Sequence, residues 1–308
     1  MEQLTRRAFA GFLAAAPSLG SLSAMEKRPT AKFPTAARDR LAVATYPFRD
    51  DIVTGRKKPG KATKANLTLE EFAQTIVPTF KVNGIEPWGR HFKSVEPDYI
   101  EGLRDSFHGA GVHVVNIPVD VREHLCGSAQ EREQTLAEYH KWVDAAVMLG
   151  SPSIRVHLPR AQKSDEIACA VSGLKALATY GESKNIVITL ENDDPATEEP
   201  ERIVRVIEGV NSPYLRSLPD FCNSMLIHND EKYNLDALNK LFSMAYSISH
   251  VKDSEQDGKN VVKVNLDAIF AAAKKARYKG YFSMEFDREG DPYQGTREMI
   301  AASLRNLG

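Results

Sequence analysis

Residues 186–194 read IVITLENDD, a short apolar run rich in β-branched residues that ends in acidic side chains. Three later stretches are also short runs with an ionisable residue at or near the carboxyl end: LRSLPD at 215–220, SISHVK at 247–252 and YFSMEF at 281–286. A run of this length and composition is typical of a buried β-strand. The sequence therefore predicts four buried strands, each with an ionisable side chain at or near its carboxyl end.

Eight such runs occur along the chain, and successive runs start 29 to 41 residues apart, the length of a strand–loop–helix–loop unit. The predicted strands are residues 41–46, 82–86, 113–118, 153–158, 186–191, 215–220, 247–252 and 281–286. Helix signals lie between them, such as the N-cap at Thr68 and the glycine that follows 135–149. This alternation predicts an α/β fold, a (β/α)8 TIM barrel over residues 41–308.

An open, doubly wound sheet is the alternative fold. Such a sheet usually carries a glycine-rich phosphate loop after its first strand. Here Tyr46-Pro47-Phe48-Arg49-Asp50 follows the first predicted strand instead. The barrel is therefore the preferred interpretation.

The overall composition is that of an ordinary globular protein, with 308 residues, 42% hydrophobic side chains and 26% charged side chains. The formal net charge of −1 gives no global field for nucleic acid or an anionic membrane, so neither is an expected partner. Three cysteines, Cys126, Cys169 and Cys222, are too few for a disulfide framework. We expect all three to be buried, unreactive thiols, of which at least one is unpaired.

The first 24 residues resemble a bacterial twin-arginine export signal. Arg6-Arg7, flanked by Thr5 and Phe9, precedes a short apolar run and a stretch of small residues. Pro17 and Gly20 interrupt that run well before about 20 apolar residues, so no membrane span is expected. We expect an exported, periplasmic protein in which residues 25–40 form a polar linker.

Four residues at the predicted carboxyl ends of successive strands define the candidate site: Glu191, Asp220, His250 and Glu285. In a TIM barrel, strand ends meet at one opening. Three carboxylates gathered there would repel one another, and a divalent cation would compensate them. Oxygen-rich ligands with one nitrogen favour Mn²⁺, Mg²⁺ or Co²⁺, and Zn²⁺ is admissible. Four ligands leave open positions for substrate oxygens.

This pattern resembles the xylose-isomerase-like barrel superfamily, which includes sugar isomerases, ketose 3-epimerases and inosose dehydratases. The four residues lie 29, 30 and 35 positions apart, close to the spacing in that family. The fragments that carry the resemblance are residues 84–86, 188–192, 250–253 and 283–285. The resemblance implies the same metal ligands here. By analogy with the epimerases, Glu191 and Glu285 would also be the catalytic acid and base.

One position departs from the epimerases: Asn223 stands where they usually have a histidine, three residues after the aspartate. Asparagine binds a hydroxyl but does not shuttle protons. This difference weakens both the epimerase assignment and an endonuclease-IV-like interpretation. The other expected substrate-binding residues lie on strands two, four and seven or directly after them: Glu86, Trp88, Arg155, His157 and Lys252.

The function expected is a metal-dependent isomerase or epimerase of a sugar or keto-sugar derivative, acting by proton abstraction next to a carbonyl. The alternative is a metal-dependent lyase or hydrolase of a keto-polyol or oxidised glycoside on the same site. An endonuclease-IV-like nuclease and a non-catalytic sugar-binding barrel are weaker options. The expected partner is a small sugar, and the sequence leaves open whether the chain forms a homo-oligomer.

Overall fold

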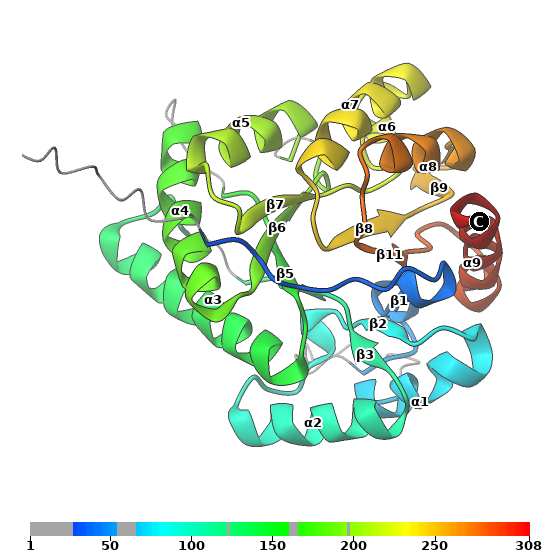
Figure 1. Cartoon of the computed structure of the whole chain (residues 1–308), viewed down its shortest axis with the longest axis horizontal. Coiled ribbons are helices and arrows are strands. Elements are labelled where there is room, and N and C mark those ends of the chain that lie inside the picture. The colour runs from blue at the N-terminus through cyan, green and yellow to red at the C-terminus, as the bar shows by residue number, and fades with distance from the viewer. Residues whose placement is uncertain (1–26, 54–65, 122–123, 160–165, 196–197) are drawn as a thin grey trace, which may run out of the picture.

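A computed structural model describes residues 27–53, 66–121, 124–159, 166–195 and 198–308 (Figure 1). The predicted export segment, residues 1–24, lies outside them. The parallel strands of the barrel are β1 (Leu41–Ala44), β2 (Gly84–Glu86), β3 (His113–Val114), β4 (Ile117–Pro118), β5 (Ser153–Val156), β6 (Val187–Glu191), β7 (Leu215–Leu218), β8 (Ile248–Val251) and β11 (Tyr281–Met284). Each of the eight predicted strands is present at its predicted place.

The strands close into a ring. One run of paired strands has the order β3-β2-β1-β11-β8, and the other has the order β4-β5-β6-β7. β3 and β4 are consecutive pieces of one predicted strand, so they join the two runs on one side. Parallel bridges from Ser217 to Ala245 and from Asp220 to His250 join them on the other side. The two runs therefore form one closed ring, in which the first and last strands, β1 and β11, are neighbours. This closure confirms the barrel and excludes the open sheet.

Helices surround the strands (Figure 1). They are α1 (Leu69–Phe80), α2 (Pro97–Gly109), α3 (Ala129–Leu149), α4 (Glu166–Lys184), α5 (Pro200–Val210), α6 (Met225–His228), α7 (Glu231–Met244), α8 (Leu266–Lys275) and α9 (Pro292–Leu307). α1 begins at the predicted Thr68 cap, which forms a capping box with Glu71. α3 begins earlier than its apolar periodicity indicates, because Ser128 and Glu131 form a second capping box.

Two local features differ from the predicted strands. The third predicted strand breaks at Val115 and Asn116, where its pairing changes from β2 to β5. The side chain of Asn116 turns into the barrel and donates a hydrogen bond to Glu86. In addition, an antiparallel hairpin of β9 (Ser254–Asp257) and β10 (Asn260–Lys263), which the sequence analysis did not predict, follows β8.

The predicted linker packs against the amino-terminal end of the barrel over the part that is described, residues 27–40. The ring of Phe33 contacts the rings of Tyr246 and Tyr281, with centroid distances of 5.2 and 5.6 Å. The hydroxyl of Tyr246 donates a hydrogen bond to the carbonyl of Pro29. Arg40 donates hydrogen bonds to the carbonyls of Tyr278 and Gly280. This segment covers the end of the barrel opposite the candidate site.

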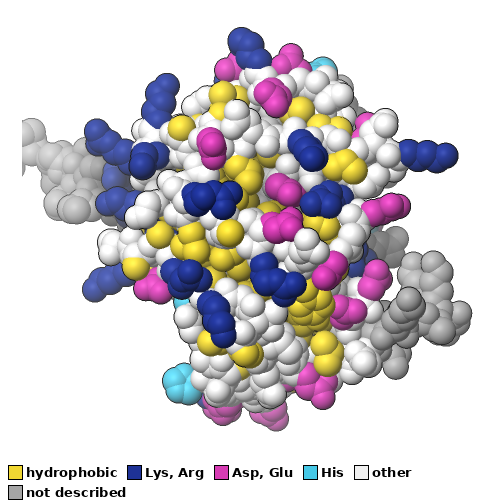
Figure 2. Space-filling model, turned by 90° about the vertical axis from the view of Figure 1, so that its right-hand side faces the viewer, with side chains coloured by type: hydrophobic (Ala, Val, Ile, Leu, Met, Phe, Trp, Pro, Cys, Tyr) yellow, Lys and Arg dark blue, Asp and Glu magenta, His cyan; other side chains and the backbone are white. Residues whose placement is uncertain are grey.

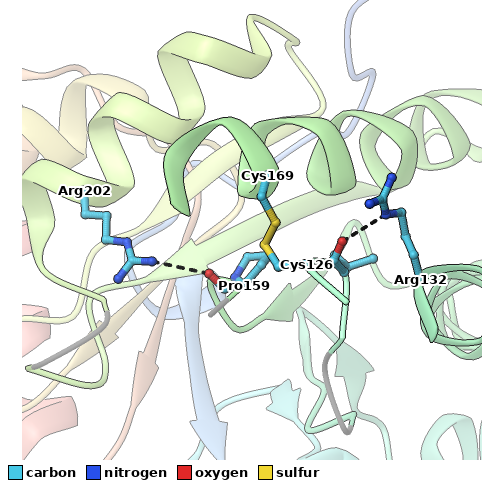
Figure 3. Close-up of a disulfide and its surroundings, with 6 residues drawn as sticks. Cys126, Arg132, Pro159, Cys169 and Arg202 are labelled. Atoms are coloured by element: carbon cyan, nitrogen blue, oxygen red, sulfur yellow. Dashed lines mark hydrogen bonds between the residues drawn. A yellow bond between two sulfur atoms is a disulfide. The ribbon is translucent and has the colours of Figure 1, made fainter. Parts of the chain in front are cut away.

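The cysteine prediction was wrong for two of the three residues. Cys126 and Cys169 form a disulfide, with 5.5 Å between their Cα atoms, and Cys222 is a free, buried thiol. Figure 3 shows the disulfide joining the loop before α3 to the first turn of α4. Sequence spacing did not reveal the pair because the two residues, 43 positions apart, meet only when α3 and α4 pack side by side.

The surface carries both signs of charge. The face drawn in Figure 2 carries both basic and acidic side chains, with apolar areas between them. This mixture agrees with the formal net charge of −1. None of the helices in the described part of the chain combines the length and apolar character that crossing a membrane requires.

Candidate metal centre

The four predicted ligands meet at the carboxyl ends of four consecutive barrel strands. Glu191 ends β6, Asp220 follows β7, His250 lies in β8 and Glu285 follows β11. All four side chains are buried. One ligand atom from each residue lies within 4.8 Å of those of the others. The barrel therefore brings together residues up to 94 positions apart, as the repeated strand-end pattern predicts.

His250 is oriented by contacts on both ring nitrogens. Its Nε2 lies 3.0 and 3.1 Å from the two carboxylate oxygens of Glu86. Its Nδ1 faces Glu191 at 2.7 Å and Glu285 at 3.2 Å. Beside a metal-binding histidine, a carboxylate usually accepts a hydrogen bond from one ring nitrogen. The other ring nitrogen is then free to bind the ion. Nδ1 would therefore be the ligand atom for an ion bound here.

Asp220 is also oriented by its surroundings. Its Oδ1 accepts hydrogen bonds from the backbone N–H groups of Cys222 and Asn223, at 2.9 and 2.8 Å. The side-chain amide of Asn192 holds the Asp220 backbone on both its N–H and its carbonyl. The second carboxylate oxygen, Oδ2, is buried and has no hydrogen-bond partner. A buried, unpartnered carboxylate oxygen facing the other ligands fits a cation.

The electrostatics of the cluster also favour added positive charge. Burial, together with the nearby carboxylates of Glu191 and Glu285, raises the pKa of Asp220 to about 8 despite the opposing charge of Lys252. Burial alone would lower the pKa of His250, but Glu191, Glu285 and Glu86 raise it well above its ordinary value. Both shifts mean that Asp220 and His250 bind protons more tightly than the isolated groups would. A divalent cation would replace those protons.

Two basic groups, both predicted as substrate-binding residues, lie beside the carboxylates. Arg155 Nε lies 3.1 Å from Glu191 Oε2. Lys252 Nζ lies 3.3 Å from Glu285 Oε2 and 3.7 Å from Asp220 Oδ2. These cations reduce the repulsion within the cluster. They leave Asp220 Oδ2 and His250 Nδ1 facing the common centre, so the donor set still fits a metal ion.

The donor set is three carboxylates and one imidazole. It suits Mn²⁺, Mg²⁺ or Co²⁺, and it admits Zn²⁺. The residues that would hold the ion are the four predicted ones, and a second group of possible ligands, His157, Asp193 and Glu198, lies farther out at the mouth. In that group Arg155 already lies beside His157, which disfavours a second cation there.

A network centred on Asp120 forms one wall of the barrel mouth. Its carboxylate accepts hydrogen bonds from Trp88 Nε1 at 2.8 Å and from His157 Nε2 at 3.1 Å. It also pairs with Arg90 at 2.8 Å and with Arg155 at 3.4 Å. Burial would raise the pKa of Asp120, but these donors hold it well below its ordinary range. Asp120 therefore links the loop after β2 to the strand that carries Arg155.

The structure separates the predicted substrate-binding residues into two groups. Lys252 and Asn223 lie next to the ligands, and Lys252 Nζ donates to Asn223 Oδ1 at 2.9 Å. The Asn223 amide nitrogen is buried and without a partner, so it can donate to a substrate oxygen. Arg155, His157 and Trp88 lie around Asp120. Glu86 is fully buried behind His250, which makes it a positioning residue.

Several residues that support the site were not predicted. Asp120 and Glu198 hold His157, and Asn192 holds Asp220. Asp287 pairs with Arg49 at 3.0 Å at the edge of the mouth. Asn192 and Asp287 lie one and two residues after a predicted ligand. Their position just after a strand end could therefore have identified them as site residues. Asp120 and Glu198 lie in loops, where spacing gives no such signal.

Comparison with known proteins agrees with this architecture. Residues 78–307 match the family described as xylose isomerase-like TIM barrel. A xylose isomerase-like TIM barrel protein from Mycobacterium smegmatis, solved in complex with magnesium, is 16% identical, with a TM-score of 0.70 over 88% of this chain and 98% of that one. No curated protein matches the sequence.

Two further solved structures are sugar epimerases. The 3-keto-D-glucoside 4-epimerase from E. coli is 18% identical, with a TM-score of 0.64 over 86% of this chain and 98% of that one. A D-psicose 3-epimerase, solved in the presence of D-fructose, is 14% identical, with a TM-score of 0.63 over 87% of this chain and 96% of that one. The fold and the strand-end cluster define a (β/α)8 protein with a candidate metal centre. This chain belongs to the xylose isomerase-like TIM barrel family.

The Asp120 network generates a prediction on pH. Burial and Arg155 lower the pKa of His157, but hydrogen bonds to Asp120 and Glu198 outweigh them and raise it from 6.5 to about 9. Since the folded-state pKa is the higher one, protonated His157 contributes its full stabilisation below pH 6.5 and loses it as the pH rises through about 9. We expect the free energy of unfolding to fall over this window, and to fall less in His157→Gln.

Urea denaturation across that pH window measures the difference. His108→Gln, at an exposed position of α2, is the matched control and should follow the wild-type curve. Equal slopes for the wild type and His157→Gln would show that the network does not hold a proton on His157.

Proposed function

We propose that this chain is a metal-dependent isomerase or epimerase of a sugar or keto-sugar derivative, and that it removes a proton next to a carbonyl group. One observation carries the proposal: two buried glutamates, Glu191 and Glu285, flank the same imidazole nitrogen, and each has its own cation, Arg155 or Lys252. Two carboxylates with separate partners can exchange a proton with opposite faces of one substrate.

The cations give the two glutamates different environments. Burial would raise the pKa of Glu285, but His250 and Lys252 lower it below its ordinary range, so this carboxylate is ionised. Arg155 holds Oε2 of Glu191 and leaves Oε1 toward the centre of the site. A bound divalent ion would polarise the substrate carbonyl and acidify the neighbouring C–H bond.

The remaining polar groups suit a polyhydroxylated substrate. Burial would lower the pKa of Lys252, but Asp220, Glu285, Glu255 and Asp287 raise it well above its ordinary value, so the ammonium is charged and can donate to a carbonyl or alkoxide oxygen. The unpartnered amide nitrogen of Asn223 can donate to a neighbouring hydroxyl. Proton removal by one glutamate and return by the other would pass through an enediolate, with these donors stabilising the oxygen charge.

The sugar epimerases among the solved structures of this fold support the substrate class in the proposal. The same carboxylate could also serve a lyase of a keto-polyol, because proton removal is the first step of both reactions. A protonated Lys252 beside Glu285 would then be the group that protonates the leaving oxygen. Product analysis distinguishes the two reactions, since only elimination changes the composition of the substrate.

The proposal predicts that the Mn²⁺-loaded protein exchanges a carbon-bound proton of a ketose with D₂O. Glu191→Gln and Glu285→Gln should each lower the exchange rate by about 10²–10⁴-fold, because each removes an acid–base group. Mass spectrometry or NMR of the recovered sugar measures the exchange. Circular dichroism should show an unchanged fold in both variants.

Glu133→Gln, at an exposed position of α3, is the matched control and should exchange at the wild-type rate. Full exchange in both active-site variants would exclude these glutamates as the acid and base. If the wild type exchanges no proton of any ketose or keto-glycoside tested, the isomerase proposal fails.

We further infer that the protein acts after export to an oxidising compartment. The disulfide between Cys126 and Cys169 supports this inference, because such bonds persist in the periplasm and are rare in the cytosol. The paired arginines Arg6 and Arg7 support it independently.

Fractionation of cells that express the full chain tests this inference. The wild type should be periplasmic and should carry the disulfide, as shown by thiol labelling under denaturing conditions. Arg6→Lys combined with Arg7→Lys should retain the chain in the cytosol with free thiols. A wild-type protein that stays in the cytosol would contradict export.

A further inference from the structure

A cleft of about 540 Å³ opens beside the metal centre. Three segments line it: Pro47–Asp51 after β1, Glu255 and Gln256 of β9, and the segment from Phe286 to Pro292 that leads from β11 into α9. Its volume falls in the range of about 300–1,000 Å³ that is typical of ligand pockets. The four metal ligands do not line this cleft, so it is a separate compartment of the mouth.

Lys252 lies between the cleft and the metal centre. Lys252 Nζ lies 3.0 Å from Glu255 Oε2 and 3.8 Å from Asp287 Oδ2, and both of these acids line the cleft. The same Nζ lies 3.3 Å from Glu285 of the metal centre. The cleft is therefore adjacent to the metal centre, with the Lys252 ammonium in contact with acids of both.

The charges of the cleft disfavour an anion. Its described lining holds more acids than bases: the acids are Asp50, Asp51, Glu255, Asp287 and Glu289, and the bases are Arg49 and Arg288. Both of these arginines are already engaged. Arg49 pairs with Asp287 at 3.0 Å, and Arg288 lies 3.6 Å from Asp253. A phosphate or carboxylate entering here would meet an excess of negative charge.

The chemistry of the walls suits hydroxyl groups. Carboxylates are acceptors only, so they bind groups that donate, and every sugar hydroxyl can donate. Apolar side chains of Pro47, Phe48, Phe286 and Pro292 contribute to the same lining. A sugar ring, with C–H faces and hydroxyl edges, matches both kinds of surface.

We propose that this cleft is a subsite for an uncharged, polyhydroxylated group that the substrate carries beyond its reacting ring. The substrate is then an unphosphorylated glycoside rather than a free or phosphorylated monosaccharide. This inference rests on the proposed function, because it takes the metal centre as the place of reaction. Under this proposal, residues 47–51 and 286–292 select the substrate, and none of them is one of the proposed catalytic residues.

Calorimetric titration of the Mn²⁺-loaded protein with matched ketoses tests the subsite. The probes are D-fructose, its 6-phosphate, and two fructose glycosides that differ in linkage, lactulose and isomaltulose. At least one glycoside should bind tenfold or more tightly than fructose, and the phosphate should bind at least tenfold more weakly than fructose. If neither glycoside binds more tightly than fructose, or if the phosphate binds as well as fructose, the subsite proposal is overturned.

Charge-reversal variants test whether the discrimination against phosphate arises in this cleft. Asp50→Lys combined with Glu289→Lys, both at exposed positions, should improve binding of fructose 6-phosphate at least tenfold and leave fructose unchanged. Glu133→Lys on α3 adds the same kind of charge away from the cleft and should change neither. An equal gain in both proteins would show that the effect is general attraction and not a property of the cleft.

The outcome for the subsite is distinguishable from the outcome for the proposed function. Proton exchange in fructose without any preference for glycosides would leave the isomerase proposal intact and remove the subsite. Preferential binding of a glycoside without proton exchange in any sugar would leave the subsite and remove the isomerase.

Discussion

The hydrogen-bonded pair of Glu86 and His250 is the constraint on which the candidate site depends. Glu86 holds Nε2 of the imidazole, so Nδ1 faces Glu191 and Glu285. Glu86 is itself fixed by Asn116, whose side chain donates to it at 2.8 Å. Since all of these groups are buried in the barrel, removing any one would leave an unpaired charge or donor. By orienting His250, the pair allows the candidate ligands at four strand ends to face a common centre.

The fold and the ligand set could be predicted because both follow from a repeated local pattern. An apolar run of five or six residues, an ionisable residue at its end and an amphipathic helix recur at a regular spacing, and parallel closure places every strand end at one opening. The supporting groups could not be predicted in the same way. Asp120 lies in a loop, and its four donors come from β5, from the residue that follows β5 and from the loop after β2. Only the closed barrel shows that these elements meet.

The differences from the sequence-based predictions have identifiable physical causes. The disulfide joins Cys126 to Cys169 through the packing of α3 against α4, which spacing along the chain does not encode. The described part of the polar segment before β1 packs on the barrel because Phe33 has aromatic partners in Tyr246 and Tyr281. Lys252 and Arg155 show that the carboxylates are not left uncompensated. Oδ2 of Asp220, which is buried and has no hydrogen-bond partner, is therefore a stronger argument for a metal than the count of acids.

Anomalous diffraction from a crystal soaked in Mn²⁺ tests the central claim most directly, because it locates the ion and identifies its ligand atoms. The account predicts one peak bonded to Glu191, to Asp220 Oδ2, to Glu285 and to His250 through Nδ1, with Nε2 still on Glu86. Glu86→Gln should preserve the fold and weaken the peak. A peak at another place, coordination of His250 through Nε2, or no peak at millimolar Mn²⁺ would contradict the account.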